Sequence, residues 1–110
     1  MPDTKSSLIS LGDLTLRDGG RIPSAQLAYA TWGTLNEDRS NAVLIFHALS
    51  GSQHLAGFNP DVPGTADRWN NECQTGWWDD FVGPGKTVDT DRFFVVCANY
   101  LGGCYGSTGS

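Results

Sequence analysis

The sequence predicts an α/β fold in which an antiparallel hairpin is followed by parallel central strands. Two apolar runs lead to this prediction, residues 42–46 and residues 93–97. Continuous runs rich in β-branched and aromatic residues are typical of strands buried on both faces of a parallel sheet. A long stretch without a hairpin turn separates the runs, and parallel neighbours need such a crossover connection.

The hairpin is predicted from the first third of the chain. Leucine or isoleucine recurs in loose alternation with polar residues from Leu8 to Leu16, and this segment ends before Asp18-Gly19. An Asp-Gly pair is typical of tight hairpin turns. A second segment returns over residues 26–32 and stops at Gly33. We therefore expect two antiparallel strands at one edge of the sheet.

The stretch from Gly51 to Asp91 has no clear hydrophobic period and is rich in Gly, Pro, Asn and Trp. This composition predicts an ordered loop with short helical pieces. Residues 67–69 and 77–82 are the strongest candidates for helical turns, and the second ends before Gly83-Pro84 as a helix should.

Length and charge narrow the class of protein. The chain has 110 residues, whereas an α/β enzyme usually needs about 200 to 250 residues in one unit, so we expect part of a larger domain. The net charge of −5 and seven scattered Lys and Arg residues argue against nucleic-acid binding. No apolar run approaches a membrane span and the start lacks the apolar core of a signal peptide, which predicts a cytoplasmic protein without membrane attachment.

The cysteines and histidines do not form a metal-binding pattern. Cys73, Cys97 and Cys104 are an odd, sparse set without a Cys-x-x-Cys pair, and His47 and His54 have no Cys or Glu at zinc-ligand spacing. We therefore expect no metal site, and free thiols as in a reducing compartment.

The first apolar run ends in a pattern that indicates a functional loop. His47 is followed by the small residues Ala48, Ser50 and Gly51. Backbone N–H groups just past His47 are then uncovered at the carboxyl end of a strand, where ligands bind in open α/β sheets. A loop of this kind after the third strand also supplies one N–H of the oxyanion hole in serine-dependent acyl-transfer enzymes.

Five blocks of the chain occur in the same order in one enzyme family. They are His47-Ala48-Leu49-Ser50-Gly51 with His54 and Gly57, Gly76-Trp77-Trp78-Asp79, Gly83-Pro84-Gly85-Lys86, residues 89–99 and residues 101–109. Together they resemble the amino-terminal part of the homoserine O-acetyltransferases, an acyltransferase branch of the α/β-hydrolase superfamily. Two positions depart from the family pattern, because Thr is more frequent at Ser50 and an acidic residue is frequent near Ser52.

The resemblance implies that residues 1–110 are the amino-terminal part of an α/β-hydrolase-type domain, with the nucleophile elbow and later strands beyond Ser110. It implies a methionine-biosynthesis enzyme that moves an acetyl group from acetyl-CoA to the hydroxyl of L-homoserine. A succinyl donor, a serine acceptor and an α/β-fold hydrolase are the alternatives. The 110 residues alone are expected to be an inactive fragment. For the complete protein we expect small-molecule substrates, no permanently bound cofactor, no nucleic-acid or membrane partner, and a homodimer.

By the same resemblance, the catalytic group of this chain is the backbone N–H of Leu49, as one of two oxyanion donors. The serine nucleophile, the acid and the catalytic His follow in that order beyond Ser110. His47 is expected to be structural, its ring shaping the loop, in preference to a catalytic base. His54 is expected to be a surface or turn residue.

One local string competes with this assignment. Gly102-Gly103-Cys104-Tyr105-Gly106 has the spacing of a nucleophile elbow with cysteine in place of serine. Several residues separate it from the preceding apolar run, however, and glycine at Gly106 and Gly109 disfavours the helix that must follow an elbow. We therefore expect a Gly-rich loop. A phosphate-binding role for Ser107, Thr108 and Ser110 also lacks a matching motif.

Trp77 and Trp78 admit two interpretations. As large apolar side chains they are expected to pin the long loop onto the sheet through the area they bury. The alternative is that they form a wall of the acyl-donor pocket.

Overall fold

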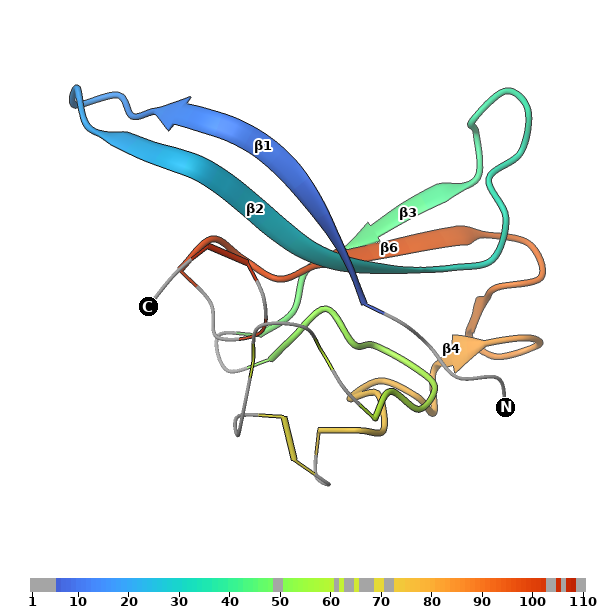
Figure 1. Cartoon of the computed structure of the whole chain (residues 1–110). Helices are drawn as coiled ribbons and strands as arrows, with labels where there is room; N and C mark the ends of the chain where they lie inside the picture. Colours follow the sequence, from blue (N-terminus) through green and yellow to red (C-terminus); the bar gives the residue numbers. More distant parts are fainter. Residues whose placement is uncertain are drawn as a thin grey trace.

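The computed structural model describes residues 6–48, 51–60, 62, 65, 69–70, 73–102, 105 and 107–108. These residues form a four-stranded sheet with the order β1-β2-β6-β3, and a long loop lies below it (Figure 1). The strands are β1 (Ser7–Thr15), β2 (Arg21–Trp32), β3 (Ala42–Ile45) and β6 (Phe94–Ala98). A separate short pair consists of β4 (Val82–Gly83) and β5 (Val88–Asp89).

The hairpin at the start of the chain is confirmed. β1 and β2 pair antiparallel from Ser7 opposite Tyr29 to Thr15 opposite Arg21. β2 begins at Arg21, earlier than the sequence indicated, because Asp13 holds the early part of the strand. Its carboxylate accepts hydrogen bonds from the Arg21 guanidinium at 2.5 Å and from the Ser24 N–H at 2.8 Å.

The predicted parallel pair is also confirmed. β3 runs parallel to β6, with Ala42 opposite Phe94 and Ile45 opposite Cys97. β6 pairs on its other side with β2 in the antiparallel sense, so β6 is the inner strand and β3 lies at the edge. The chain leaves β2 through Gly33, where φ is +83° and an added Cβ would lie 2.2 Å from the Phe93 carbonyl oxygen. Only glycine fits this close approach.

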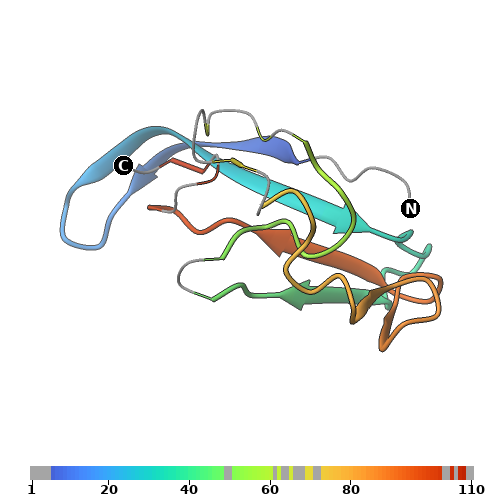
Figure 2. The ribbon, with the colours of Figure 1, turned by 90° about the horizontal axis from the view of Figure 1, so that it is seen from below.

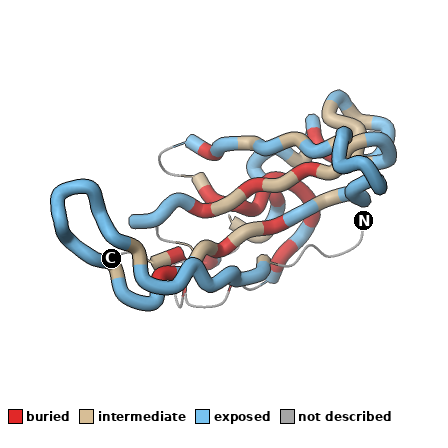
Figure 3. Tube along the Cα trace, turned by 90° about the horizontal axis from the view of Figure 1, so that it is seen from above, coloured by how far each residue is buried: buried red, intermediate tan, exposed pale blue. Residues whose placement is uncertain are grey.

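The core lies between the sheet and the long loop. Its buried members come from both layers: Leu55, Ala56, Val82, Val95 and Cys97. Seen from below, the loop crosses in front of the strands (Figure 2). In Figure 3 buried and half-buried positions alternate along β6, whereas the far end of the hairpin is exposed.

The opposite face of the sheet is open, because no segment among the described residues packs against it. In and just after β3, Leu44 is 59% exposed and Phe46 is 69% exposed. A groove of about 370 Å³ also runs along this face, lined by Ile9, Leu27, Tyr29, Thr31, Phe94, Val96 and Ala98. Side chains alternate between the two faces of a strand, so every second residue of each apolar run points away from the loop that covers the other face.

The long loop has less helix than expected. Residues 77–81 form a turn in which the Val82 N–H donates to the Trp78 carbonyl at 3.1 Å. That single helical turn leads directly into β4 instead of ending at Gly83-Pro84. Of the other predicted helical turn, residues 67 and 68 lie outside the described residues. Within the described part of the chain, no helix is long and apolar enough to span a membrane.

Candidate oxyanion loop at the end of β3

The candidate site lies where the parallel strands β3 and β6 end side by side. His47 comes two residues after β3, and Tyr100 comes two residues after β6. Their rings stack with centroids 3.9 Å apart and an angle of 25° between the planes. Because carboxyl ends of parallel strands meet at one edge of the sheet, residues 53 positions apart are brought into contact here.

His47 is buried and all its polar ring atoms have partners. The Nδ1 atom lies 2.6 Å from the Ala48 carbonyl oxygen, and Nε2 lies 3.3 Å from the Tyr100 backbone nitrogen. A carbonyl only accepts and a backbone N–H only donates, so the proton is on Nδ1 and Nε2 is the acceptor. Nε2 is also 3.4 Å from the Asn99 side-chain nitrogen. These contacts support the structural role expected for His47.

A tight turn follows His47. The Gly51 N–H donates to the Ala48 carbonyl at 2.8 Å, so this carbonyl accepts two hydrogen bonds, one from Gly51 and one from the His47 ring. A Cβ added at Gly51 would lie 3.1 Å from the His47 Cβ and 3.2 Å from the Ala48 oxygen. The small residue that the sequence pattern singled out therefore lies where a larger side chain would be tightly packed. Leu49 and Ser50 lie outside the described residues, and the role of Leu49 stays a prediction.

The segment after β6 makes hydrogen bonds to the middle of β2. Asn99 is fully buried, and its carbonyl accepts from the Ser107 hydroxyl at 2.5 Å. The same hydroxyl accepts from the Ala28 N–H at 2.9 Å, and the Thr108 hydroxyl accepts from the Gln26 N–H at 2.7 Å. Ser107 and Thr108 thus satisfy backbone groups of the sheet, which explains them without a bound phosphate. Cys104, the competing nucleophile, lies outside the described residues.

His54 is buried in the loop layer, so the expectation of a surface or turn residue is wrong as to its exposure. Its Nε2 lies 2.6 Å from the Gln74 carbonyl oxygen, and its ring is tilted against Trp69 at 5.6 Å. Burial lowers its pKa below the usual 6.5, while the hydrogen bond to Gln74 acts in the opposite direction.

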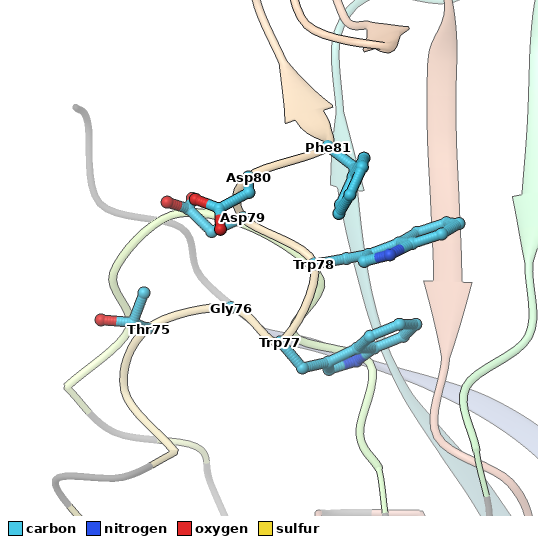
Figure 4. Close-up of a pocket in the computed structure, with 7 residues that line it drawn as sticks. All are labelled: Thr75, Gly76, Trp77, Trp78, Asp79, Asp80 and Phe81. Carbon is cyan, nitrogen blue, oxygen red and sulfur yellow. The ribbon is translucent and has the colours of Figure 1, made fainter.

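Trp77 and Trp78 stack on each other with ring centroids 5.5 Å apart, and Phe81 continues the series at 5.8 Å from Trp78. These rings line a cavity of about 170 Å³ whose remaining lining is Thr75, Gly76, Asp79 and Asp80 (Figure 4). Trp77 is 43% exposed and Trp78 37% exposed, so the prediction that buried area holds them is only partly confirmed. The Trp77 indole N–H instead anchors the ring by donating to the Ser52 carbonyl at 2.8 Å.

Among the described cysteines, Cys97 is a free thiol. Burial raises the pKa of the Cys97 thiol to about 12, so it is protonated and unreactive at neutral pH. No group of three or more potential metal ligands occurs among the residues that the structure describes.

Comparison with known proteins identifies the relatives of this chain. No protein-family model matches it. It is 54% identical over 96 residues to a homoserine O-acetyltransferase from Thermobifida fusca, and these residues are 87% of this chain and 23% of that protein. The chain is homologous to the homoserine O-acyltransferases. A homoserine O-succinyltransferase from Halothiobacillus neapolitanus is 56% identical over 96 residues, again 87% of this chain and 22% of the relative. The chain thus spans about a fifth of the length of these homoserine O-acyltransferases.

Solved structures confirm the α/β-hydrolase fold of this homoserine O-acyltransferase homologue. A homoserine O-acetyltransferase from Bacillus anthracis superposes with a TM-score of 0.72 at 38% identity, over 92% of this chain and 24% of that one. Esterase E22 superposes with a TM-score of 0.73 at 33% identity, over 91% of this chain and 25% of that one. Both likenesses extend over the sheet and the loop that follows β3.

Two residues of the site were missed by sequence reasoning, namely Asn99 and Tyr100. They directly follow the second apolar run. The rule that pointed to His47, that ligand-binding residues follow the ends of parallel strands, applies to them equally and would have found them.

Proposed function

We propose that this chain is part of a homoserine O-acyltransferase that moves an acetyl group from acetyl-CoA to the hydroxyl of L-homoserine. The observation that carries the proposal is the turn of Ala48 and Gly51, placed at the carboxyl end of β3 in a chain 54% identical to a protein of that name. A loop in this position is suited to bind the oxyanion of an acyl-transfer intermediate.

In the proposed reaction a serine beyond Ser110 attacks the thioester carbonyl of acetyl-CoA, and coenzyme A leaves from the tetrahedral intermediate. The homoserine hydroxyl then attacks the acyl-serine, and the serine is regenerated. Both steps place negative charge on the former carbonyl oxygen. We propose that the backbone N–H of Leu49 donates to this oxygen, a contribution whose removal typically lowers kcat by about 10² to 10³.

The hydrogen bonds of Ala48 support this assignment. Its carbonyl accepts from both the His47 ring and Gly51, so the oxygen of the Ala48–Leu49 peptide bond is directed into the turn. Two hydrogen bonds to this oxygen fix the position of Ala48, the residue directly before the proposed donor, and an oxyanion donor must be preorganised in this way.

Identity alone does not separate the acyl donors, since relatives named for acetyl and for succinyl transfer are 54% and 56% identical. We propose acetyl-CoA as donor, used as a substrate and not held as a resident cofactor. A second candidate function is ester hydrolysis, in which water replaces homoserine. It is favoured by the likeness to esterase E22.

The test uses a chimera in which this chain replaces the stretch of the Thermobifida fusca protein that it matches. Coenzyme A release is recorded with acetyl-CoA or succinyl-CoA, each with and without L-homoserine or L-serine. We expect release that requires acetyl-CoA and homoserine together. Release independent of any amino acid would instead support the hydrolase, and a preference for succinyl-CoA or serine would reassign the donor or the acceptor.

We also propose that the complete protein is a cytoplasmic homodimer. The free thiol of Cys97 is compatible with a reducing compartment. Light scattering on the chimera after size-exclusion chromatography measures its mass, and a monomeric mass would contradict the dimer.

A further inference from the structure

We propose that Tyr100 is a positioning residue for the turn closed by Ala48 and Gly51, and that it acts through His47. The inference rests on the proposed acyl-transfer function, in which this turn carries an oxyanion donor. Tyr100 itself does not contact the reacting atoms.

Tyr100 holds His47 by three different contacts. Its hydroxyl donates to the His47 carbonyl at 2.5 Å, its backbone N–H donates to the His47 Nε2 at 3.3 Å, and the two rings stack at 3.9 Å. The contacts involve the backbone, the ring edge and the ring face of His47. Together they fix both the position of the chain as it leaves β3 and the orientation of the imidazole.

The orientation of the imidazole is transmitted to the turn. Since Nε2 accepts from Tyr100, the proton is on Nδ1, and Nδ1–H donates to the Ala48 carbonyl at 2.6 Å. The Gly51 N–H donates to the same oxygen. A chain of hydrogen bonds therefore runs from the end of β6 through the His47 ring to the carbonyl that anchors the turn. Hydrogen bonds in such chains strengthen one another.

A packing role alone does not account for Tyr100. Tyr100 is 38% exposed in this chain. Its hydroxyl is directed at the carbonyl group of His47, next to the turn, which is a specific interaction and not general burial. Such directional contacts are what a catalytic loop needs, because a misplacement of about 1 Å can reduce turnover by roughly 10².

The test compares Tyr100→Phe and Tyr100→Leu in the chimera. The Phe variant removes the hydroxyl and keeps the stacked ring, whereas the Leu variant removes both. Tyr29→Phe is the matched control, because Tyr29 lines the groove on the open face of the sheet, away from the turn. The readouts are kcat, KM for homoserine, the burst of p-nitrophenol from p-nitrophenyl acetate, and the inhibition constant of ethylboronic acid. A boronic acid forms a tetrahedral adduct with the serine and so reports on oxyanion binding.

We expect Tyr100→Phe to lower kcat and the burst rate by about tenfold, and Tyr100→Leu by more, since positional errors of less than 1 Å are sufficient for such losses. Ethylboronic acid should bind more weakly by a similar factor, whereas KM for homoserine and the melting temperature should stay close to those of the parent chimera. Tyr29→Phe should match the parent in every readout.

Unchanged kcat and burst rate in both Tyr100 variants would overturn the proposal. So would a loss that follows the melting temperature without weaker boronic acid binding, because that is the result expected of a merely structural residue. If the parent chimera released no coenzyme A in response to homoserine, the proposed function would fail. The burst and boronic acid readouts would still decide the role of Tyr100, since they need no homoserine.

Discussion

Gly76 offers a sharp test of how the long loop is held on the sheet. A Cβ added at this position would lie 2.2 Å from the Ala56 backbone nitrogen and 2.3 Å from the Leu55 carbonyl carbon. Ordinary contacts of this kind are longer by more than 1 Å. Both atoms belong to the backbone and cannot rotate away, so in Gly76→Ala one of the two segments must shift.

The hydrogen bonds around Gly76 give the magnitude. Three of them join the segments: Gly76 N–H to the Gly57 carbonyl at 2.9 Å, Trp77 N–H to His54 at 3.2 Å, and Trp78 N–H to Leu55 at 2.8 Å. A shift of about 1 Å lengthens all three beyond good geometry. At a net contribution of about 1 kcal/mol for each hydrogen bond, the expected loss of unfolding free energy is about 3 kcal/mol. Overpacking of a core has a similar magnitude, about 1 to 3 kcal/mol.

Urea unfolding of the chimera measures this loss as a lower midpoint with an unchanged slope. Gly20→Ala is the matched control, because a Cβ at Gly20 would meet only the end of the Leu16 side chain at 3.4 Å, an ordinary contact. We expect the control to change stability by less than about 0.5 kcal/mol. If Gly76→Ala were no more destabilising than Gly20→Ala, the two segments would not be packed as the structure describes.

Three further predictions concern the loop and the open face. Leu49→Pro removes the proposed oxyanion donor and should lower kcat of the chimera by about 10² or more. Leu49→Ala keeps the N–H, so its kcat should stay within about tenfold of the parent value. Equal turnover of the two variants would contradict the assignment. His54 has a lowered pKa in the folded state, so its contribution to stability is present above pH 6.5 and should be lost as the pH falls below that value toward the folded pKa. In His54→Asn this part of the pH dependence of urea unfolding should disappear. If the same pH dependence persisted in the variant, it would come from another group. Residues 1–110 expressed alone should self-associate and show no cooperative monomeric unfolding and no coenzyme A release, because leaving a few hundred Å² of apolar surface in water forfeits on the order of 5 to 10 kcal/mol. Phe46→Lys on the open face should reduce the association seen by light scattering. A cooperative monomeric transition of the parent chain would refute the prediction.

The elements of the sheet could be predicted because their signals are local. The apolar runs of β3 and β6 and the Asp18-Gly19 turn are readable within a few residues, and a long connection without a hairpin turn leaves parallel pairing as the expected arrangement for the two runs. The small residues after His47 were recognised for the same reason. A Cβ added at Gly51 would lie 3.1 Å from the His47 Cβ, so little room is left for a side chain there.

The arrangement of the site was decided by contacts between distant parts of the chain. The insertion of β6 between β2 and β3 brings Tyr100 onto His47. The sequence pattern gives the end of each strand but not the contact between the two rings. The apolar runs indicated that both faces of β3 and β6 are suited to burial, and the structure shows which of the two faces this chain covers. Hydrophobic sequence indicates that a face is suited to burial, but whether it is buried depends on which segment packs against it.

The sequence by itself therefore determined which residues form strands, which connection is parallel and where a small-residue turn follows a strand, since backbone and side-chain preferences act over a few positions. Only the tertiary structure decided the strand order, which face of the sheet is covered, and the contacts of Tyr100 with His47. These depend on contacts between residues as much as 53 positions apart, and such contacts form only when the whole sheet has assembled.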